Sequence, residues 1–202
     1  MENYIVINGQ KTCLTEAQVK KIKGCISTPN LKLADVPAGE TFKLGSHEFV
    51  VLEQTGDTTA IIQKGLLPNQ RFGDTNNFNG SDVRDACNKF AVEIADIVGE
   101  DNLVEHTVDL TSDDGLKDYG TIKIRCSLLT SDLYRRYVDI LDKFNPDEWW
   151  WLATAHSTKR HENDRWVKCV SPSGYFDNDG YISNGYGVRP FCILKSTIFV
   201  SK

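Results

Sequence analysis

Two very short connections between apolar segments constrain the fold of this chain more than any other feature of its sequence. Gly45-Ser46 and Gly56-Asp57 separate three segments whose composition favours strands, residues 41–44, 47–54 and 58–63. Parallel strands need a crossover connection of about a dozen residues or more, so connections this short permit only antiparallel neighbours. The sequence therefore predicts an antiparallel meander without crossover helices.

Two other segments have the apolar periodicity of α-helices. Residues 81–96 are expected to form one helix, with Ser81 as its N-cap and Gly99 just beyond its end. Residues 131–142 are expected to form the other. The side chains expected to face the core are Val83, Cys87, Phe90, Ile94 and Ile97 in the first helix, and Leu133, Tyr137, Ile140 and Leu141 in the second.

The rest of the main domain is predicted to consist of short strands and loops. The expected strands are residues 107–110, 122–126, 148–154, 165–170 and 188–194. Residues 67–80 and 155–164 are polar and are expected as loops, and Asp177-Asn178-Asp179-Gly180 is expected as a hairpin turn. We expect Arg189 to pair with a carboxylate, and Pro190, which lacks a ladder donor, to lie at a strand start or edge.

The first 31 residues are predicted to form a small appendage. Residues 4–7 favour a strand, and Asn8-Gly9 is a strong turn signal. Thr15 and Gln18 have the spacing of a capping box, which indicates the start of a helix. The sequence therefore predicts a strand, a turn and a helix ahead of the main domain.

Composition and charge limit the classes of function. Apolar residues make up 40% of the chain and charged residues 25%, values near the globular average that predict a packed core. The net charge of −5 argues against a protein that holds nucleic acid by neutralising phosphates. No apolar run approaches the ~20 residues of a membrane-spanning helix, and the N-terminal residues lack a signal-peptide pattern. We therefore expect a cytoplasmic protein without a membrane partner.

The six cysteines are expected to be reduced thiols. They lie at positions 13, 25, 87, 126, 169 and 192, with no CxxC pair. The even count also fits disulfides, but a chain of this size does not need them, and the cytosol keeps thiols reduced. Cys169 and Cys192 stand in apolar strand patterns without a neighbouring histidine, so inert buried thiols are expected there rather than nucleophiles.

The order of motifs in the last third of the chain carries a family resemblance. Trp149-Trp150-Trp151-Leu152 is followed by Trp166-Val167, Asp179-Gly180-Tyr181 and Gly187-Val188-Arg189-Pro190. Matching upstream positions are Gly39, Phe42, Leu44, Gly45 and the helix start Ser81-Asp82-Val83-Arg84. Over residues 32–198 the chain resembles a family of uncharacterised domains from gut Firmicutes and their phages. That family is similar in layout to C-type-lectin-like and formylglycine-generating-enzyme-like folds.

The resemblance implies a fold and a class of function. It implies an α+β, C-type-lectin-like fold of antiparallel sheets and two helices for residues 32–202, after the strand-turn-helix appendage of residues 1–31. It also implies a non-catalytic cytosolic binding protein of phage or prophage type. Such a protein would engage a host protein, for example to inhibit a defence system such as a CRISPR nuclease. The cysteine motif of formylglycine-generating enzymes is not evident, so that activity is not transferred.

Two alternatives stay open beside host-protein binding. One is a small-ligand or glycan-binding module of a phage particle, and the other is an enzyme of unrecognised type. An enzyme would need titratable groups that converge in a pocket, for example His156 or His161 beside Cys169. No catalytic residue, metal or cofactor is assigned from the sequence.

The expected recognition surface is the loop of residues 156–165, which follows the tryptophan-rich strand, together with residues 175–186. Loops on rigid strands commonly carry binding residues, and interfaces favour aromatic and arginine side chains. The candidate binding residues are His156, Lys159, Arg160, His161, Arg165, Trp166, Tyr175, Tyr181 and Tyr186. The nearby charges of Asp113, Asp114 and Asp118 are expected to mark a solvated loop.

Two patterns in this region were weighed as metal sites. His156, His161 and Asp164 fall close together, but nothing in a polar loop fixes them as ligands. Asp177-x-Asp179-Gly180 resembles the start of a calcium loop, but Val188 stands where the twelfth-position glutamate belongs. An exposed loop and a hairpin turn are therefore the expected structures.

Overall fold

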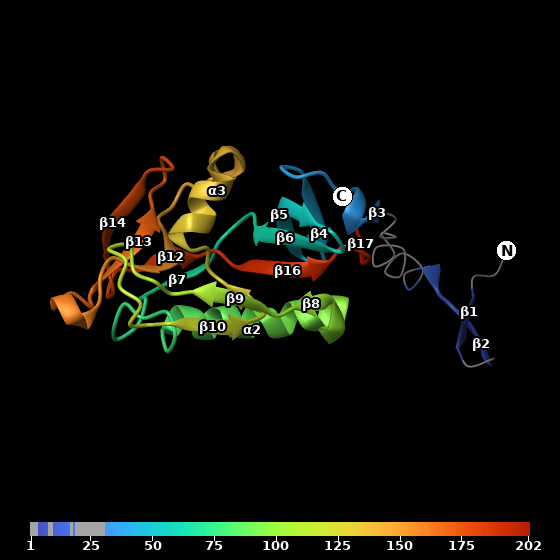
Figure 1. The fold of residues 1–202 in the computed structure, drawn as a ribbon. Helices are drawn as coiled ribbons and strands as arrows, with labels where there is room; N and C mark the ends of the chain where they lie inside the picture. The colour runs from blue at the N-terminus through green and yellow to red at the C-terminus, as the bar shows by residue number, and fades with distance from the viewer. Residues whose placement is uncertain (1–3, 8–9, 17, 19–30) are drawn as a thin grey trace.

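The computed structural model describes residues 4–7, 10–16, 18 and 31–202, and it is a mixed α+β structure with several antiparallel sheets. Its two largest sheets have six and five strands and lie next to one another (Figure 1). Helix α2 (Asp82–Val98) runs along one side of these sheets, and helix α3 (Ser131–Leu141) lies on the other.

The six-stranded sheet contains the predicted meander. Its strands are β4 (Thr41–Leu44), β5 (His47–Thr55), β6 (Thr58–Gln63), β8 (Leu103–Val104), β11 (Cys126–Ser127) and β16 (Phe191–Lys195). β4, β5 and β6 pair antiparallel in chain order, which confirms the prediction from the two short turns. β16 comes from the far end of the chain and pairs with β6, β8 and β11, so it joins the two halves of the sequence.

The five-stranded sheet has the tryptophan-rich strand at its centre. In spatial order its strands are β14 (Phe176–Tyr181), β13 (Trp166–Val170), β12 (Trp150–Ala155), β15 (Tyr186–Val188) and β7 (Leu67–Gln70). β12 pairs antiparallel with β13 and parallel with β15. The prediction of a continuous loop over residues 67–80 was wrong at its start, because β15 provides a partner strand that local composition does not reveal.

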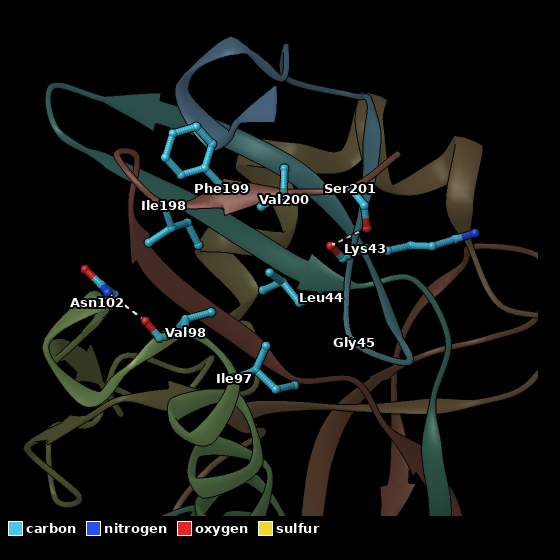
Figure 2. Close-up of a pocket in the computed structure, with 10 residues that line it drawn as sticks. All are labelled: Lys43, Leu44, Gly45, Ile97, Val98, Asn102, Ile198, Phe199, Val200 and Ser201. Carbon is cyan, nitrogen blue, oxygen red and sulfur yellow. Dashed lines mark hydrogen bonds between the residues drawn. The ribbon is translucent and has the colours of Figure 1, made fainter. Parts of the chain in front are cut away.

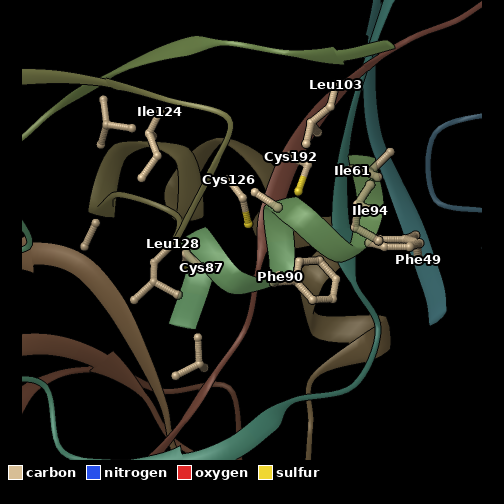
Figure 3. Close-up of a cluster of buried hydrophobic side chains, with 14 of the residues drawn as sticks. Phe49, Ile61, Cys87, Phe90, Ile94, Leu103, Ile124, Cys126, Leu128 and Cys192 are labelled. Carbon is tan, nitrogen blue, oxygen red and sulfur yellow. The ribbon is translucent and has the colours of Figure 1, made fainter. Parts of the chain in front are cut away.

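The hydrophobic core has two parts, one on each side of the sheets. Phe90 of α2 packs with Phe49 and Ile61 of the six-stranded sheet in the first part (Figure 3). α3 packs in the second part with Trp150, while Trp151 belongs to the first. The two central tryptophans thus fill both sides of one strand, as the alternation of side chains along a strand requires.

Hydrogen bonds at the helix starts agree with the caps read from the sequence. Ser81 Oγ accepts the backbone N–H of Arg84 at 3.1 Å, which confirms the predicted N-cap of α2.

In α3 the buried apolar side chains are Tyr134, Tyr137 and Leu141. Leu133 and Ile140, which were predicted to face inward, are only partly buried, because they lie at the margin of the face that contacts the sheet.

The other described elements are short. They are β1 (Tyr4–Ile7) paired with β2 (Gln10–Cys13), β3 (Leu31–Lys32) with β17 (Phe199–Val200), β9 (His106–Asp109) with β10 (Thr121–Ile124), and the 3₁₀-helices η1 (Leu33–Asp35), η2 (Glu100–Asn102), η3 (Asp142–Phe144) and η4 (Lys159–His161). The capping box is confirmed, because the Gln18 N–H donates to Thr15 Oγ1 at 3.3 Å and the Thr15 N–H to Gln18 Oε1 at 2.9 Å. The predicted turn at Asn8-Gly9 lies outside the described residues.

The single strand predicted over residues 188–194 is two strands in different sheets. β15 ends at Val188, and β16 begins at Phe191. Pro190 stands immediately before β16, as predicted, and its carbonyl accepts the Gln63 N–H at 2.9 Å. Arg189 and Pro190 therefore form the crossover between the two large sheets.

Arg189 is buried, and no described carboxylate pairs with it, so that prediction was wrong. Its guanidinium donates to the carbonyls of Gln63 at 3.0 Å and Phe144 at 2.8 Å, and lies 5.0 Å from the ring centroid of Trp150. Desolvation by burial lowers the pKa of Arg189 to about 10. Carbonyl dipoles and an aromatic face thus take the place of a carboxylate, and the WWL and GVRP motifs meet in the core as one structural unit.

The predicted hairpin turn at residues 177–180 lies inside strand β14. β14 pairs with β13 in a register that places Gly180 opposite Val167. The chain turns earlier, where the Gly174 N–H donates to the Ser171 carbonyl at 2.9 Å. Gly180 is needed for space and not for a turn, because a Cβ there would lie 2.5 Å from Trp151 Cζ3.

Gly180→Ala is expected to lower the free energy of unfolding by about 1–3 kcal/mol, the usual range for overpacking a core. Gly185→Ala is the matched control, because a Cβ at that position meets no atom within 4 Å. Chemical denaturation of the two variants beside the parent chain measures both effects. A Gly180→Ala protein as stable as the Gly185→Ala protein would show that the close approach to Trp151 imposes no constraint.

Candidate functional site

Residues 156–165, the predicted recognition loop, are held by an aspartate from the segment after β9. Asp114 Oδ2 accepts the Ser157 hydroxyl at 2.6 Å and lies 3.0 Å from His161 Nδ1. Asp114 Oδ1 accepts the Ser112 hydroxyl at 2.5 Å. Desolvation raises the pKa of Asp114, but the hydrogen bonds from Ser112, Ser157 and His161 together hold it well below its usual range. Asp114 is therefore an ionised anchor for the loop.

A second aspartate, four residues after Asp114, also holds the recognition loop. Asp118 accepts the Thr158 hydroxyl at 2.6 Å and forms an ion pair with the guanidinium of Arg160. The Thr158 hydroxyl also caps η4 by accepting the Arg160 N–H at 3.3 Å. The segment that contains Asp114 and Asp118 is an exposed loop, as predicted, but tertiary contacts also bring these two carboxylates to the recognition loop.

Asn76 is a buried hub beneath the recognition loop. Its side-chain amide nitrogen lies 3.0 Å from the Ser157 carbonyl, 3.3 Å from the Asn163 carbonyl and 2.9 Å from the Trp166 carbonyl. Its Oδ1 accepts the Tyr119 hydroxyl at 2.6 Å. One amide thus ties both ends of the loop to a third segment, and the side chains on the loop are presented from a fixed backbone.

Two exposed aromatic rings stand beside this loop. Trp166 begins β13 and Tyr181 ends β14, and the two are opposite each other in the ladder. Their ring centroids are 5.1 Å apart in an edge-to-face arrangement, with 36% and 37% of each residue exposed. Because β14 is an edge strand, no neighbouring strand of the sheet covers this pair on its outer side.

Six of the predicted binding residues are brought together here, and we call them the aromatic–cationic surface. They are Lys159, Arg160, His161, Arg165, Trp166 and Tyr181, all exposed. Lys159 to His161 form η4, and Arg165 and Trp166 follow at the end of the same loop. The Arg165 guanidinium donates to the Asp74 carbonyl at 3.2 Å, which orients it on this surface.

The structure places Tyr175 and Tyr186 away from this surface and His156 next to Trp166. Tyr175 is exposed, but it lies in the turn after Val170, at the opposite end of β13 from Trp166. Tyr186 is half-buried and its ring lies 4.5 Å from that of Trp151. His156 is half-buried, and its backbone N–H donates to the Trp166 carbonyl at 2.9 Å. Tyr186 therefore packs against the tryptophan-rich strand, and His156 borders the aromatic–cationic surface.

Asp114, Asp118 and Asn76 are the residues of the site that the sequence interpretation missed. Each lies at least 38 positions before the loop that it holds, as the sequence numbers show. Acidic and amide side chains in polar segments are usually solvated, so no local pattern distinguishes these three. Only the packing of the segment after β9 against the recognition loop identifies them.

The described thiols are buried, apart from the exposed Cys13. None of the described cysteines forms a disulfide, and Cys169 is buried near Gly180 while His161 is exposed. Burial raises the pKa of Cys126 well above its ordinary value, and neighbouring Cys192 raises it further, so this thiol is a poor nucleophile. Within the described part of the chain, no group of three or more His, Cys, Asp or Glu side chains is placed to hold a metal ion.

A cavity of about 430 Å³ lies at the opposite end of the molecule, between β4, the end of α2 and β17 (Figure 2). Ile97 and Phe199 line it and are 45% and 55% exposed, so the prediction that Ile97 faces the core was wrong. Lys43 is the one titratable residue among those lining it. This cavity offers apolar contacts but no acid–base pair.

No helix among the described residues is both long and apolar enough to cross a bilayer.

Comparison with known families supports the resemblance at a coarse level. The family model of a domain of unknown function (DUF6273) matches residues 108–196, which run from within β9 to just past the end of β16. The matched stretch includes the WWL and GVRP motifs and all six residues of the aromatic–cationic surface. It also includes Asp114 and Asp118, but not Asn76. No curated protein and no solved structure matches the chain.

Proposed function

We propose that this chain is a non-catalytic binding protein that engages a host protein through the aromatic–cationic surface. The observation that carries the proposal is the exposed pair formed by Trp166 on β13 and Tyr181 on the edge strand β14. Aromatic and arginine side chains dominate the energetics of protein interfaces, where tryptophan and tyrosine bury large areas with few rotatable bonds.

Pre-organisation supports the same proposal. Asp114, Asp118 and Asn76 fix the backbone of the loop and the positions of Arg160 and His161 before any partner arrives. A surface that is already ordered loses less conformational entropy on binding, which favours affinity. A solvated connection between two strands does not need this many side-chain hydrogen bonds to hold it in place.

The charges of this surface favour a protein partner over a nucleic acid. Arg160 pairs with Asp118, and Arg165 Nε lies 3.4 Å from Asp164 Oδ1. Cations already paired with carboxylates release few counterions from phosphates, and the chain as a whole carries a net charge of −5. The aromatic rings, and not the cations, are therefore the main binding groups.

The proposal extends to the fold and the biological setting implied by the resemblance. Two large sheets with helices on opposite sides are compatible with a C-type-lectin-like arrangement. A phage or prophage origin and a host defence component as the partner follow from the resemblance alone, and the cytoplasmic location is proposed from the sequence features described above. An experimental structure of the complex with the partner tests the fold and the interface together.

Changing Trp166 and Tyr181 together to alanine is expected to weaken partner binding by about 30-fold or more, since hot-spot residues contribute roughly 2 kcal/mol or more each. The tagged chain is used to capture proteins from bacterial lysate, and the captured protein is purified for titration. The control changes Tyr175 and Phe199, which are exposed aromatic residues away from this surface, to alanine. If the double variant retains the same protein with unchanged affinity, or the parent chain captures nothing, the proposal is wrong.

A further inference from the structure

A second hollow of about 310 Å³ lies between α3 and the side of the six-stranded sheet that α3 covers. Its floor is apolar and consists of Ala60 on β6, Phe191 and Ile193 on β16, and Leu133 on α3. Small-molecule pockets span roughly 300–1,000 Å³, so this hollow has the size for a small ligand. It shares no residue with the aromatic–cationic surface.

The hollow exists because α3 does not cover the whole sheet face. Tyr134 and Tyr137 of α3 are buried, but Ala60 and Ile193 beyond them are only partly covered. A β-bulge in β5 between Val51 and Glu53 changes the alternation of side chains there. Bulges re-aim side chains and are common next to functional sites.

The bulge explains why a carboxylate lines an otherwise apolar sheet face. Leu52 packs in the core under α3, and Glu53, the next residue, also reaches α3 on the same face. Glu53 Oε2 accepts the Tyr137 hydroxyl at 2.6 Å. Burial and the hydrogen bond to Glu53 together raise the pKa of Tyr137 to about 12, so the phenol keeps its proton. Glu53 is thus held as a hydrogen-bond acceptor at the edge of the hollow.

Arg136 lies next to the Glu53 carboxylate but forms no hydrogen bond with it. Arg136 Nη1 is 3.7 Å from Glu53 Oε2, which is longer than a hydrogen bond. Among the described residues, the contacts to Glu53 are made to Oε2 alone. One carboxylate oxygen and most of the guanidinium donors therefore stay available beside the apolar floor.

We propose that this hollow binds a small zwitterion with an apolar side chain, such as a free aliphatic or aromatic α-amino acid. The ammonium group would contact Glu53, the carboxylate would contact Arg136, and the side chain would lie on Ala60, Phe191 and Ile193. Opposite charges side by side match a zwitterion better than a simple anion or cation, because either alone would meet a like charge on one of the two residues.

His106 also lines the hollow and adds no charge to it. Its ring lies 5.3 Å from that of Phe191, and its Nε2 is 3.0 Å from Ser127 Oγ. Burial lowers the pKa of His106 to about 4, so the imidazole is neutral at neutral pH. Among the described residues that line the hollow, Glu53 and Arg136 are then the charged side chains.

Isothermal titration calorimetry of the full chain with leucine and phenylalanine tests the proposal. The comparison ligands are 4-methylpentanoic acid, which lacks the ammonium group, and 3-methylbutylamine, which lacks the carboxylate. We expect saturable binding of the amino acids, and binding about tenfold or more weaker for either comparison ligand, since hydrogen bonds to charged groups are worth more than neutral ones. Equal binding of either comparison ligand, or no binding of the amino acids, would overturn the proposal.

Variants test whether the ligand binds in this hollow. Glu53→Gln keeps an acceptor for Tyr137, and Arg136→Gln removes the cation, so each is expected to weaken binding about tenfold or more. Ala60→Leu fills the floor and should abolish binding while the charges remain. Glu48→Gln on β5 and Arg135→Gln on α3 are controls outside the hollow and should bind like the parent chain. Binding that survives both Glu53→Gln and Ala60→Leu contradicts a site here.

Discussion

Replacing Arg189 by alanine is expected to lower the free energy of unfolding by about 3–5 kcal/mol, because it combines a large cavity with unpaired buried acceptors. The lost contacts are the hydrogen bonds to the carbonyls of Gln63 and Phe144 and the stacking on Trp150. These partners come from β6, from the end of η3 and from β12. A single side chain thus connects the two large sheets at their crossover.

Arg189→Met separates packing from hydrogen bonding. Methionine fills most of the space without a buried charge, so we expect a loss about half as large, since replacing a buried cation by an apolar residue relieves its desolvation. Arg125→Ala is the control, because its ion pair with Glu100 lies at the surface, where ion pairs contribute little to stability. Urea unfolding followed by circular dichroism measures all three. A loss below that of Arg125→Ala would show that Arg189 does not hold the sheets together.

Asn76→Ala is expected to lower the free energy of unfolding by about 3 kcal/mol, because it leaves buried acceptors without a donor. The affected groups are the carbonyls of Ser157, Asn163 and Trp166 and the Tyr119 hydroxyl. Since the carbonyls of Ser157 and Asn163 belong to the recognition loop and Trp166 follows it directly, the loop should open locally before the rest of the protein unfolds. Partner binding through the aromatic–cationic surface should weaken in parallel.

Hydrogen exchange measures this local opening directly. The amides of His161 and Asn163 donate to the Thr158 carbonyl at 3.0 and 3.2 Å, so they report on the loop. Their exchange is expected to be about 100-fold faster in Asn76→Ala, which corresponds to roughly 3 kcal/mol. Asn77→Ala is the matched control, because the Asn77 side chain accepts only the exposed Asn79 N–H. Equal exchange in the two variants would contradict the role of Asn76.

Elements whose cause is local were predicted well from the sequence. The meander of β4, β5 and β6 follows from two-residue turns, and the start of α2 from the hydroxyl of Ser81. The errors have a tertiary cause. Residues 177–180 look like a turn by composition, but pairing with β13 and the lack of space beside Trp151 make them a strand.

The candidate site was predicted in part for the same reason. Exposed aromatic and cationic residues that are close in sequence, such as Arg165 and Trp166, are visible as a pattern. Their arrangement depends on Asn76, Asp114 and Asp118, whose interactions span dozens of residues and follow no periodicity. The second hollow was not predicted, because it depends on a bulge in β5 and on the length of α3.

The sequence by itself determined the short-range features: which segments pair as hairpins, where helices begin, and which loop carries aromatic and cationic side chains. These depend on turn length, capping and side-chain periodicity within a few residues. The tertiary structure alone decided that Arg189 bonds to carbonyls, that Gly180 serves close packing, and that distant polar residues fix the recognition loop. Such contacts form between segments far apart in the chain, where burial and available space, and not local propensity, select the partner.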